Sequence, residues 1–343
     1  MTISATWPAW GMMLILITGG NLMAATDVED LLAEVRRLGF TEAQNARSVR
    51  ICDAIHVTDK PTARSRYGGI PLVPAGFLWP SDADGPLQLL VEVFVSELKH
   101  APTYFPKDAA LLVFHGERGV RLQILPESAC TVVASPPAMT KFATPFVEKE
   151  AHLFGYIGVP VRVSETVTIG LDMLFDYSDQ KRNDAVWKLR ERALGNGHHD
   201  GDEVVIPGVL GWDVGIRRSS SNDPRIDAVL AEHGWQDKKW FLDREDDDIL
   251  KEISTLESAK PDYVNLDVAI HRLKSMLGTK SWWSKQLPGL TREIEAWVPV
   301  CVVGSSFKTG MMWGDFGYLT ILSQKSDEGL INPKKVHAIV ESP

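Results

Sequence analysis

Residues 65–80 read SRYGGIPLVPAGFLWP, and this stretch decides more about the fold than any other part of the chain. Its glycines and prolines exclude both a regular helix and an uninterrupted strand. The Gly68-Gly69 pair permits positive φ or a close approach by another backbone segment, whereas each proline fixes φ and removes an N–H donor. The sequence therefore predicts a loop whose backbone is specified residue by residue.

Two interpretations of this loop follow from its side chains. In the first, it is a rigid structural loop that seats Phe77 and Trp79 in a hydrophobic core. In the second, the Arg66 guanidinium and the amides of Gly68 and Gly69 form a cradle for an anion or a small polar ligand. The sequence alone leaves both open.

Two further stretches accompany the loop: MMWGDFGYL at residues 311–319 and PKDAALLVF at residues 106–114. With residues 65–80, they make the chain resemble the YwqG-like family, a bacterial domain of unknown function. The order and spacing of the three stretches fit that family from about residue 27 to the end, and Ala110 stands where the family usually has glycine. The resemblance implies a family but no activity.

The amino-acid composition limits the classes of protein to which the chain can belong. The chain has 343 residues, of which 44% are hydrophobic and 24% charged, as expected for a globular protein with a sizeable core. A net charge of -9 disfavours nonspecific binding to nucleic acid or to anionic membranes, which need clustered Lys and Arg. The three cysteines, Cys52, Cys130 and Cys301, fit neither a disulfide framework nor a metal or redox motif, so we expect reduced thiols. No cofactor and no metal are expected.

The first 25 residues form an apolar segment of their own. Its core, Met12–Ile17, resembles a short signal-peptide core but lacks preceding basic residues, and it is too short for a membrane span. We predict a cytoplasmic protein, with export through this weak signal as the alternative. A start at Met23 instead of Met1 is a further interpretation.

The rest of the chain, residues 26–343, is predicted to be α+β with mostly antiparallel sheets. A helix over 28–38 precedes a β-rich part at 50–135, a helical insertion spans 181–280, and a second β-rich part follows at 295–341. The order of strand, turn and glycine-aromatic motif in both β-rich parts suggests two pseudo-repeated halves from an old duplication.

The middle of the chain is less regular in pattern. We expect irregular structure from Pro136 through Pro160, a helix over 184–194, and a solvated polar loop at 195–203 in spite of its two histidines and three carboxylates. A stripe of apolar residues at 266–277 predicts a helix that Gly278 ends.

Glu92 is an acid in an otherwise apolar predicted strand, so it needs a partner, and Arg66 is the first candidate. If the two pair out of water, Arg66→Ala is expected to cost roughly 3–5 kcal/mol and a second change, Glu92→Gln, to recover most of it. Trp313 and Asp315 are expected to line one cleft together with Arg66 and Trp79, one wall from each half.

Two classes of function remain compatible with the sequence. The first is a non-catalytic module that binds a protein or a small polar ligand in a cleft between the halves. Its candidate residues are Arg66, Gly68, Gly69, Trp79, Glu92, Trp313 and Asp315. The second is a hydrolase or transferase in which Glu92 or Asp315 is the general base and Arg66 holds an anionic group.

Overall fold

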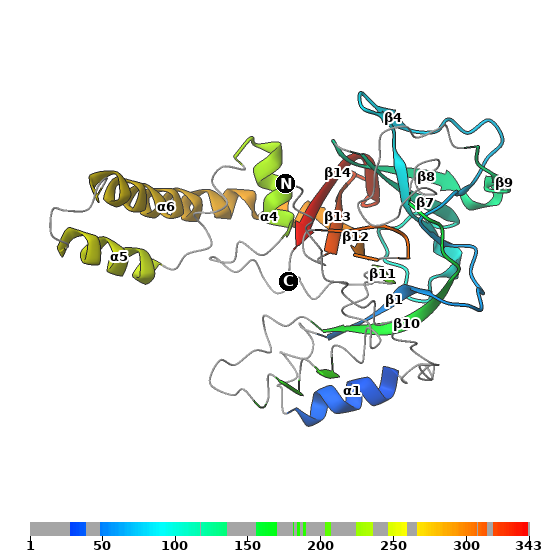
Figure 1. Ribbon diagram of the computed structural model, residues 1–343, viewed down its shortest axis with the longest axis horizontal. Coiled ribbons are helices and arrows are strands. Elements are labelled where there is room, and N and C mark those ends of the chain that lie inside the picture. The colour runs from blue at the N-terminus through cyan, green and yellow to red at the C-terminus, as the bar shows by residue number, and fades with distance from the viewer. Residues whose placement is uncertain are drawn as a thin grey trace, which may run out of the picture.

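The computed structural model describes residues 28–38, 49–116, 118–135, 156–169, 203–206, 224–235, 246–258, 266–306, 308–313 and 318–341, and a few positions between 181 and 189. Two antiparallel sheets dominate this part of the chain. One has the strand order β10-β1-β11-β12-β13-β14 and the other the order β2-β6-β7-β8. They pack face to face as a sandwich (Figure 1), and β14 lies beside β8 where the sheets meet.

The strands have the following bounds. The larger sheet contains β1 (Val49–Val57), β10 (Val161–Ile169), β11 (Glu203–Ile206), β12 (Trp297–Gly304), β13 (Tyr318–Lys325) and β14 (Ile331–Glu341). The smaller sheet contains β2 (Arg66–Tyr67), β6 (Gln88–Phe94), β7 (Ala109–Gly116) and β8 (Gly119–Pro126). Two short pairs are β3 (Leu72–Val73) with β9 (Val132–Val133) and β4 (Ser81–Asp82) with β5 (Gly85–Pro86). Single 3-10 turns are η1 (Val95–Glu97) and η2 (Glu127–Ala129).

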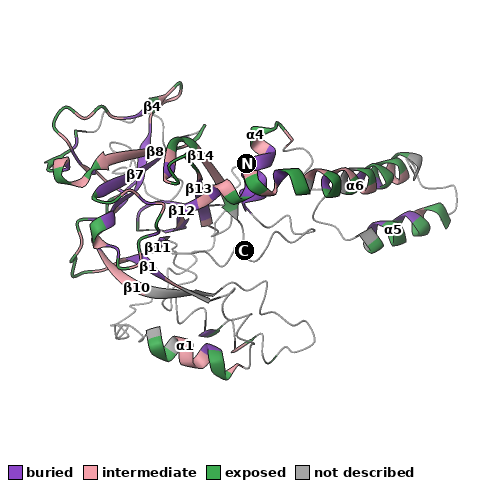
Figure 2. Ribbon diagram, turned by 180° about the vertical axis from the view of Figure 1, so that it is seen from behind, coloured by how far each residue is buried: buried purple, intermediate pink, exposed green. Residues whose placement is uncertain are grey.

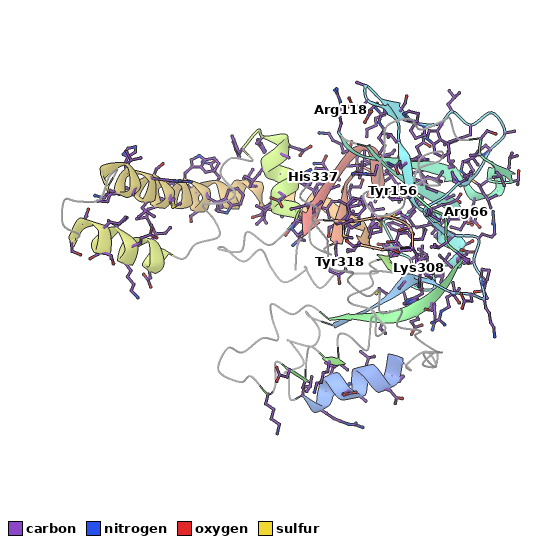
Figure 3. The ribbon with its side chains drawn as sticks, in the orientation of Figure 1. Arg66, Arg118, Tyr156, Lys308, Tyr318 and His337 are labelled. Carbon is purple, nitrogen blue, oxygen red and sulfur yellow. The ribbon has the colours of Figure 1, made fainter. Side chains whose placement is uncertain are left out.

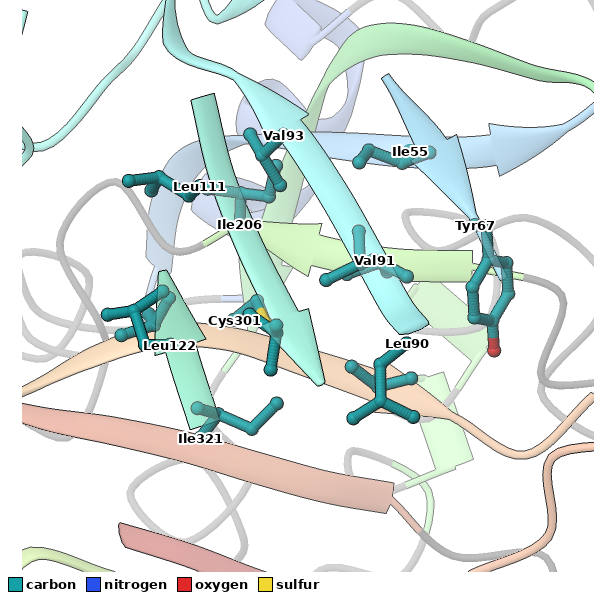
Figure 4. Packing of buried hydrophobic residues seen from close by; sticks show 14 of the residues in the cluster. Ile55, Tyr67, Leu90, Val91, Val93, Leu111, Leu122, Ile206, Cys301 and Ile321 are labelled. Atoms are coloured by element: carbon teal, nitrogen blue, oxygen red, sulfur yellow. The ribbon is translucent and has the colours of Figure 1, made fainter. Parts of the chain in front are cut away.

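Strands β6 and β7 of the smaller sheet are buried on both faces, and alternate residues point to the two faces. Val91, Leu111 and Val113 point inward to the larger sheet and form the inner core with residues such as Ile206 and Cys301 (Figure 4). Leu89, Phe94, Ala110, Leu112 and Phe114 point the other way and form the outer core. This explains why β6 and β7 read as nearly continuous apolar runs instead of alternating ones.

Residues 65–80, called the strap below, cover the outer face of the smaller sheet. Their side chains Ile70, Leu72, Val73, Phe77 and Trp79 pack on the outer core. The strap therefore covers this face of the smaller sheet, as the larger sheet covers the other face. The first interpretation of the loop, a structural element that packs on a hydrophobic core, is confirmed.

The helices lie outside the sandwich (Figure 1). They are α1 (Val28–Arg37), which contacts β10, α4 (Pro224–Glu232), α5 (Asp246–Ser258) and α6 (Leu266–Ala296). Helix α4 and the C-terminal part of α6 pack on Trp297 and Leu322 of the larger sheet. The rest of α6 extends away from the sheets beside α5, and exposed residues run along both helices there (Figure 2).

The α+β class, the helix at 28–38 and the strands at 87–95, 109–114, 120–125, 296–303, 317–322 and 335–340 are confirmed. Residues 184–185 and 188–189 are helical, as expected for that segment. All three cysteines are buried free thiols. The duplication stays a prediction.

One expectation for the middle of the chain is wrong, and two strands there, β10 and β11, were not predicted. Strand β10 begins directly after the irregular region and pairs with β1 along nine residues. Strand β11 lies within the segment at 181–280, for which helices were predicted, and it pairs between β1 and β12. Gly278 does not end a helix, because α6 continues to Ala296 and its later residues Trp283, Leu290 and Ile294 are held by packing on α4. Strand β1, at the start of the first β-rich part, belongs to the larger sheet with the strands of the second β-rich part.

None of the described helices is long and apolar enough to cross a membrane. The N-terminal apolar segment and Asp315 lie outside the described residues, as does the polar loop at 195–203 apart from Glu203.

Candidate functional site

Arg66 and Glu92 are direct cross-strand neighbours in the β2–β6 pair. Arg66 Nε lies 3.3 Å from Glu92 Oε2, without the geometry of a hydrogen bond, so the contact is ionic. The predicted pairing is confirmed. The Glu92 side chain is completely buried, but 38% of the Arg66 side chain is exposed, so the expectation of a pair wholly out of water is wrong for Arg66.

The Glu92 carboxyl group sits beneath the strap. Both of its oxygens accept the backbone N–H of Leu72, at 3.1 and 3.0 Å. Burial raises the pKa of Glu92 to about 8, while the Leu72 N–H, Arg66 and Arg64 favour the ionised form. Glu92 thus changes charge near neutral pH, although it has no contact with solvent.

A second set of polar groups anchors the start of the strap. The Glu97 carboxylate accepts hydrogen bonds from the backbone N–H groups of Arg64 and Ser65 and from Ser65 Oγ–H. Arg64 reaches Glu127 at 3.0 Å and lies over the Phe94 ring at 4.0 Å. Sequence reasoning missed these residues, because each is unremarkable in its own local pattern.

The glycines Gly68 and Gly69 have positive φ of 68° and 75°. Their N–H groups donate to the carbonyls of Leu90 and Tyr156, both at 2.8 Å. A Cβ on Gly68 would lie 2.4 Å from Ile157 O, and one on Gly69 would lie 2.6 Å from the Gly158 Cα. The glycines therefore serve a close backbone approach, and their amides are not available to cradle an anion.

The Trp79 side chain makes its contacts within the protein. Its Nε1–H donates to Leu87 O at 2.7 Å, and its ring packs edge-on against Phe114 with centroids 5.4 Å apart. This satisfies both the indole N–H and the ring within the outer core.

Trp313 belongs to the inner core, and its side chain lies against His115 and Tyr156. The ring centroids are 5.2 Å apart for His115 and 6.3 Å apart for Tyr156. Tyr156 Oη and His115 Nδ1 are 3.2 Å apart, within hydrogen-bond distance. The buried Trp313 Nε1 has no hydrogen-bond partner among the described residues.

The strand pairing places Gln88 beside His115. Gln88 lies directly opposite His115 in the β6–β7 pair, so both side chains are on one face of the sheet. Gln88 is 1% exposed, and its Oε1 also lacks a hydrogen-bond partner within the described part of the chain. We call Gln88, His115, Tyr156 and Trp313 the inner polar cluster.

Strand alternation places the predicted site residues on opposite faces of the smaller sheet. Arg66 and Glu92 are in register with Leu112 of the outer core, whereas Tyr67 is in register with Val91 and Val113 of the inner core. Figure 3 shows Arg66 at the edge of the molecule and Tyr156 farther in. Arg66, Glu92 and Trp79 therefore do not share a cleft with Trp313, and that expectation is wrong.

The two sequence motifs nevertheless meet, through the segment that begins at Tyr156. Gly69 N–H donates to Tyr156 O and Val159 N–H to Tyr67 O, while Ile157 N–H donates to Thr309 O at 3.0 Å. The inner polar cluster lies at this junction. The sequence did not predict that His115, Tyr156 and Gln88 meet Trp313, because they come from separate segments that only tertiary packing brings together.

The fold and this junction define an α+β protein built on a two-sheet antiparallel sandwich, with a polar cluster buried where two loops meet. The chain belongs to the family described as Domain of unknown function (DUF1963), whose model matches residues 65–328. A search of the curated proteins found no match.

The pairing of Arg66 with Glu92 can be measured by a double-mutant cycle. At pH 9, where Glu92 is mostly ionised, we expect Arg66→Ala and Glu92→Gln to show a coupling of about 1–2 kcal/mol, limited by the exposure of Arg66. At pH 6 Glu92 is protonated, and the coupling should approach zero. Urea unfolding of the wild type, both single variants and the double variant gives the values. Strictly additive losses at pH 9 would show that the two side chains do not interact.

Proposed function

We propose that this protein is a binding module for a small polar ligand, held at the inner polar cluster where the two sequence motifs meet. The observation that carries the proposal is the Trp313 Nε1–H group, a buried donor without a partner among the described residues. Leaving such a group unsatisfied costs about 1–3 kcal/mol, so a ligand or water that accepts its hydrogen bond is stabilised there.

A small ligand is preferred over a protein partner because the unsatisfied atoms are buried. Trp313 is 5% exposed and Gln88 is 1% exposed, so a flat protein surface does not reach them. His115 is only partly buried and is the member of the cluster nearest to solvent.

The alternative, a hydrolase or transferase with Glu92 as general base, has one observation in its favour. A carboxyl group with a pKa of about 8 is suited to proton transfer near neutral pH. For Glu92 to meet a substrate, however, the strap would have to lift Leu72 from its carboxylate. The binding function needs no such movement.

The proposed function is tested with Trp313→Phe, which removes the N–H donor but keeps an aromatic ring. The loss of ring volume and the relief of an unsatisfied donor each amount to about 1–3 kcal/mol, so we expect little net change in stability. In a thermal-shift comparison against small amides, alcohols, carboxylates and amines, compounds that stabilise the wild type should lose their effect on the variant.

Trp297→Phe is the matched control. Trp297 Nε1 is likewise buried without a partner in the described residues, but its ring faces His337 and it belongs to the packing of α4 and α6 on the larger sheet. Every compound that stabilises the wild type should also stabilise the Trp297→Phe variant. Equal losses in both variants would contradict a site at Trp313.

A further inference from the structure

The inner polar cluster offers one hydrogen-bond donor and one acceptor from different parts of the fold. Trp313 Nε1–H can only donate, and Gln88 Oε1 can only accept. Trp313 is the last residue of the 308–313 segment, whereas Gln88 begins β6. A ligand that satisfies both atoms must therefore accept at one point and donate at another.

The remaining members of the cluster carry no charge near neutral pH. Burial lowers the pKa of His115, so its imidazole is neutral, and burial raises the pKa of the Tyr156 phenol. No charged side chain among the described residues contributes to either shift. A charged ligand would lose its hydration without meeting an opposite charge, which is costly in a buried site.

The ring arrangement adds a preference for a flat group. His115 and Trp313 meet edge to face, with planes at 84°, and Tyr156 lies at 64° to Trp313. Aromatic faces and edges of this kind pack well against planar, weakly polar groups.

We propose that the inner polar cluster recognises an uncharged amide-type group, in which a C=O accepts from Trp313 Nε1–H and a neighbouring N–H donates to Gln88 Oε1. Carboxamides, lactams and ureas share this edge. The inference rests on the proposed function and adds the chemical class of the ligand to it. No bond is made or broken in this recognition.

The test uses four small probes that share one branched skeleton: acetamide, acetate, acetone and propan-2-ol. Acetamide accepts and donates at separate atoms, acetone only accepts, propan-2-ol does both through one oxygen, and acetate is charged. Each is titrated into the full-length ¹⁵N-labelled protein. The readout is the indole N–H cross-peak of Trp313, assigned by its loss in Trp313→Phe, with the Trp297 cross-peak as an internal control.

We expect acetamide to shift the Trp313 cross-peak with a dissociation constant in the millimolar range, roughly what a ligand of so few atoms can reach. Acetone, propan-2-ol and acetate should each bind at least about 10-fold more weakly, because a lost hydrogen bond or a buried charge costs 1 kcal/mol or more. The Trp297 cross-peak should not move.

Gln88→Met gives the matched variant, since it removes the acceptor and keeps a side chain of similar size. In this variant acetamide should bind no better than acetone. If Gln88→Met does not fold, the test rests on the relative affinities of the four probes for the wild-type protein.

The outcomes separate the two proposals. If all four probes shift the Trp313 cross-peak equally, or acetate shifts it most, the ligand site stands and the amide class is overturned. If none shifts it, a buried water satisfies the indole, and both the proposed function and this inference are overturned.

Discussion

Glu92→Gln is expected to make the protein more stable at alkaline pH while leaving its stability near pH 5 almost unchanged. Glutamine keeps an oxygen that accepts the Leu72 N–H but never ionises. In the wild type, the buried Glu92 carboxyl must either stay protonated or carry a charge beneath the strap. The Glu92→Gln variant has no ionisable group at this position, so deprotonation there no longer affects its stability.

The direction follows from the raised pKa. The folded protein holds the Glu92 proton up to about pH 8, whereas the unfolded chain releases it near 4.5. Between these values the folded state binds more protons, so the free energy of unfolding falls as pH rises. At about 1.4 kcal/mol per pKa unit, the wild type loses on the order of 3–5 kcal/mol relative to the variant between about pH 5 and pH 9.

The measurement is urea unfolding of both proteins at several pH values. Glu165→Gln is the control of opposite sign, because Lys99 and His100 lower the pKa of Glu165, so its charge stabilises the fold at neutral pH. That variant should be less stable than the wild type at neutral pH and converge with it in acid. Parallel curves for Glu92→Gln and the wild type would show that Glu92 is not perturbed.

Gly69→Ala is expected to be strongly disruptive for a substitution that adds a single methyl group to the strap. The residue has φ of 75°, and a Cβ there would lie 2.6 Å from Gly158 Cα, which is backbone and has no rotamer to give way. The left-handed conformation alone costs an alanine about 1–2 kcal/mol, and the clash should bring the total to about 3–5 kcal/mol.

Gly76→Ala is the control that separates the cost of the left-handed conformation from the cost of the clash. Gly76 has φ of 78°, but a Cβ there meets nothing within 4 Å. Urea unfolding should therefore show only the conformational cost of about 1–2 kcal/mol. Equal losses at the two positions would mean that the segment at 156–159 moves aside without penalty. Because that segment carries Tyr156, we also expect Gly69→Ala to weaken ligand binding at the inner polar cluster.

Local pattern in the sequence was enough to predict several elements. The apolar runs at 87–95 and 109–114 predict β6 and β7, and the periodic apolar residues at 28–38 predict α1, because strand and helix periods are properties of neighbouring residues. The pairing of Arg66 with Glu92 also followed from one local anomaly, a lone acid in an apolar strand. The sequence also predicted positive φ or a close backbone approach at Gly68 and Gly69, but not that the approaching segment is the one at 156–159.

Long-range packing decided the rest. Pairing of β1 with β10 joins residues more than a hundred positions apart, and neither strand encodes its partner in its own pattern. Helix α6 passes Gly278 because Trp283 and Ile294 gain burial against α4, which outweighs the roughly 1 kcal/mol that an internal glycine costs.

The candidate site, like the fold, was predicted only in part from the sequence. The sequence by itself determined that residues 65–80 and 311–319 are special, through the density of glycine, proline and tryptophan. Only the tertiary structure decided that Arg66 and Trp313 lie on opposite faces of one sheet, and that Gln88, His115 and Tyr156 join Trp313. The physical reason is that burial and hydrogen-bond satisfaction depend on contacts between segments distant in sequence, whereas residue composition and periodicity report only on neighbours along the chain.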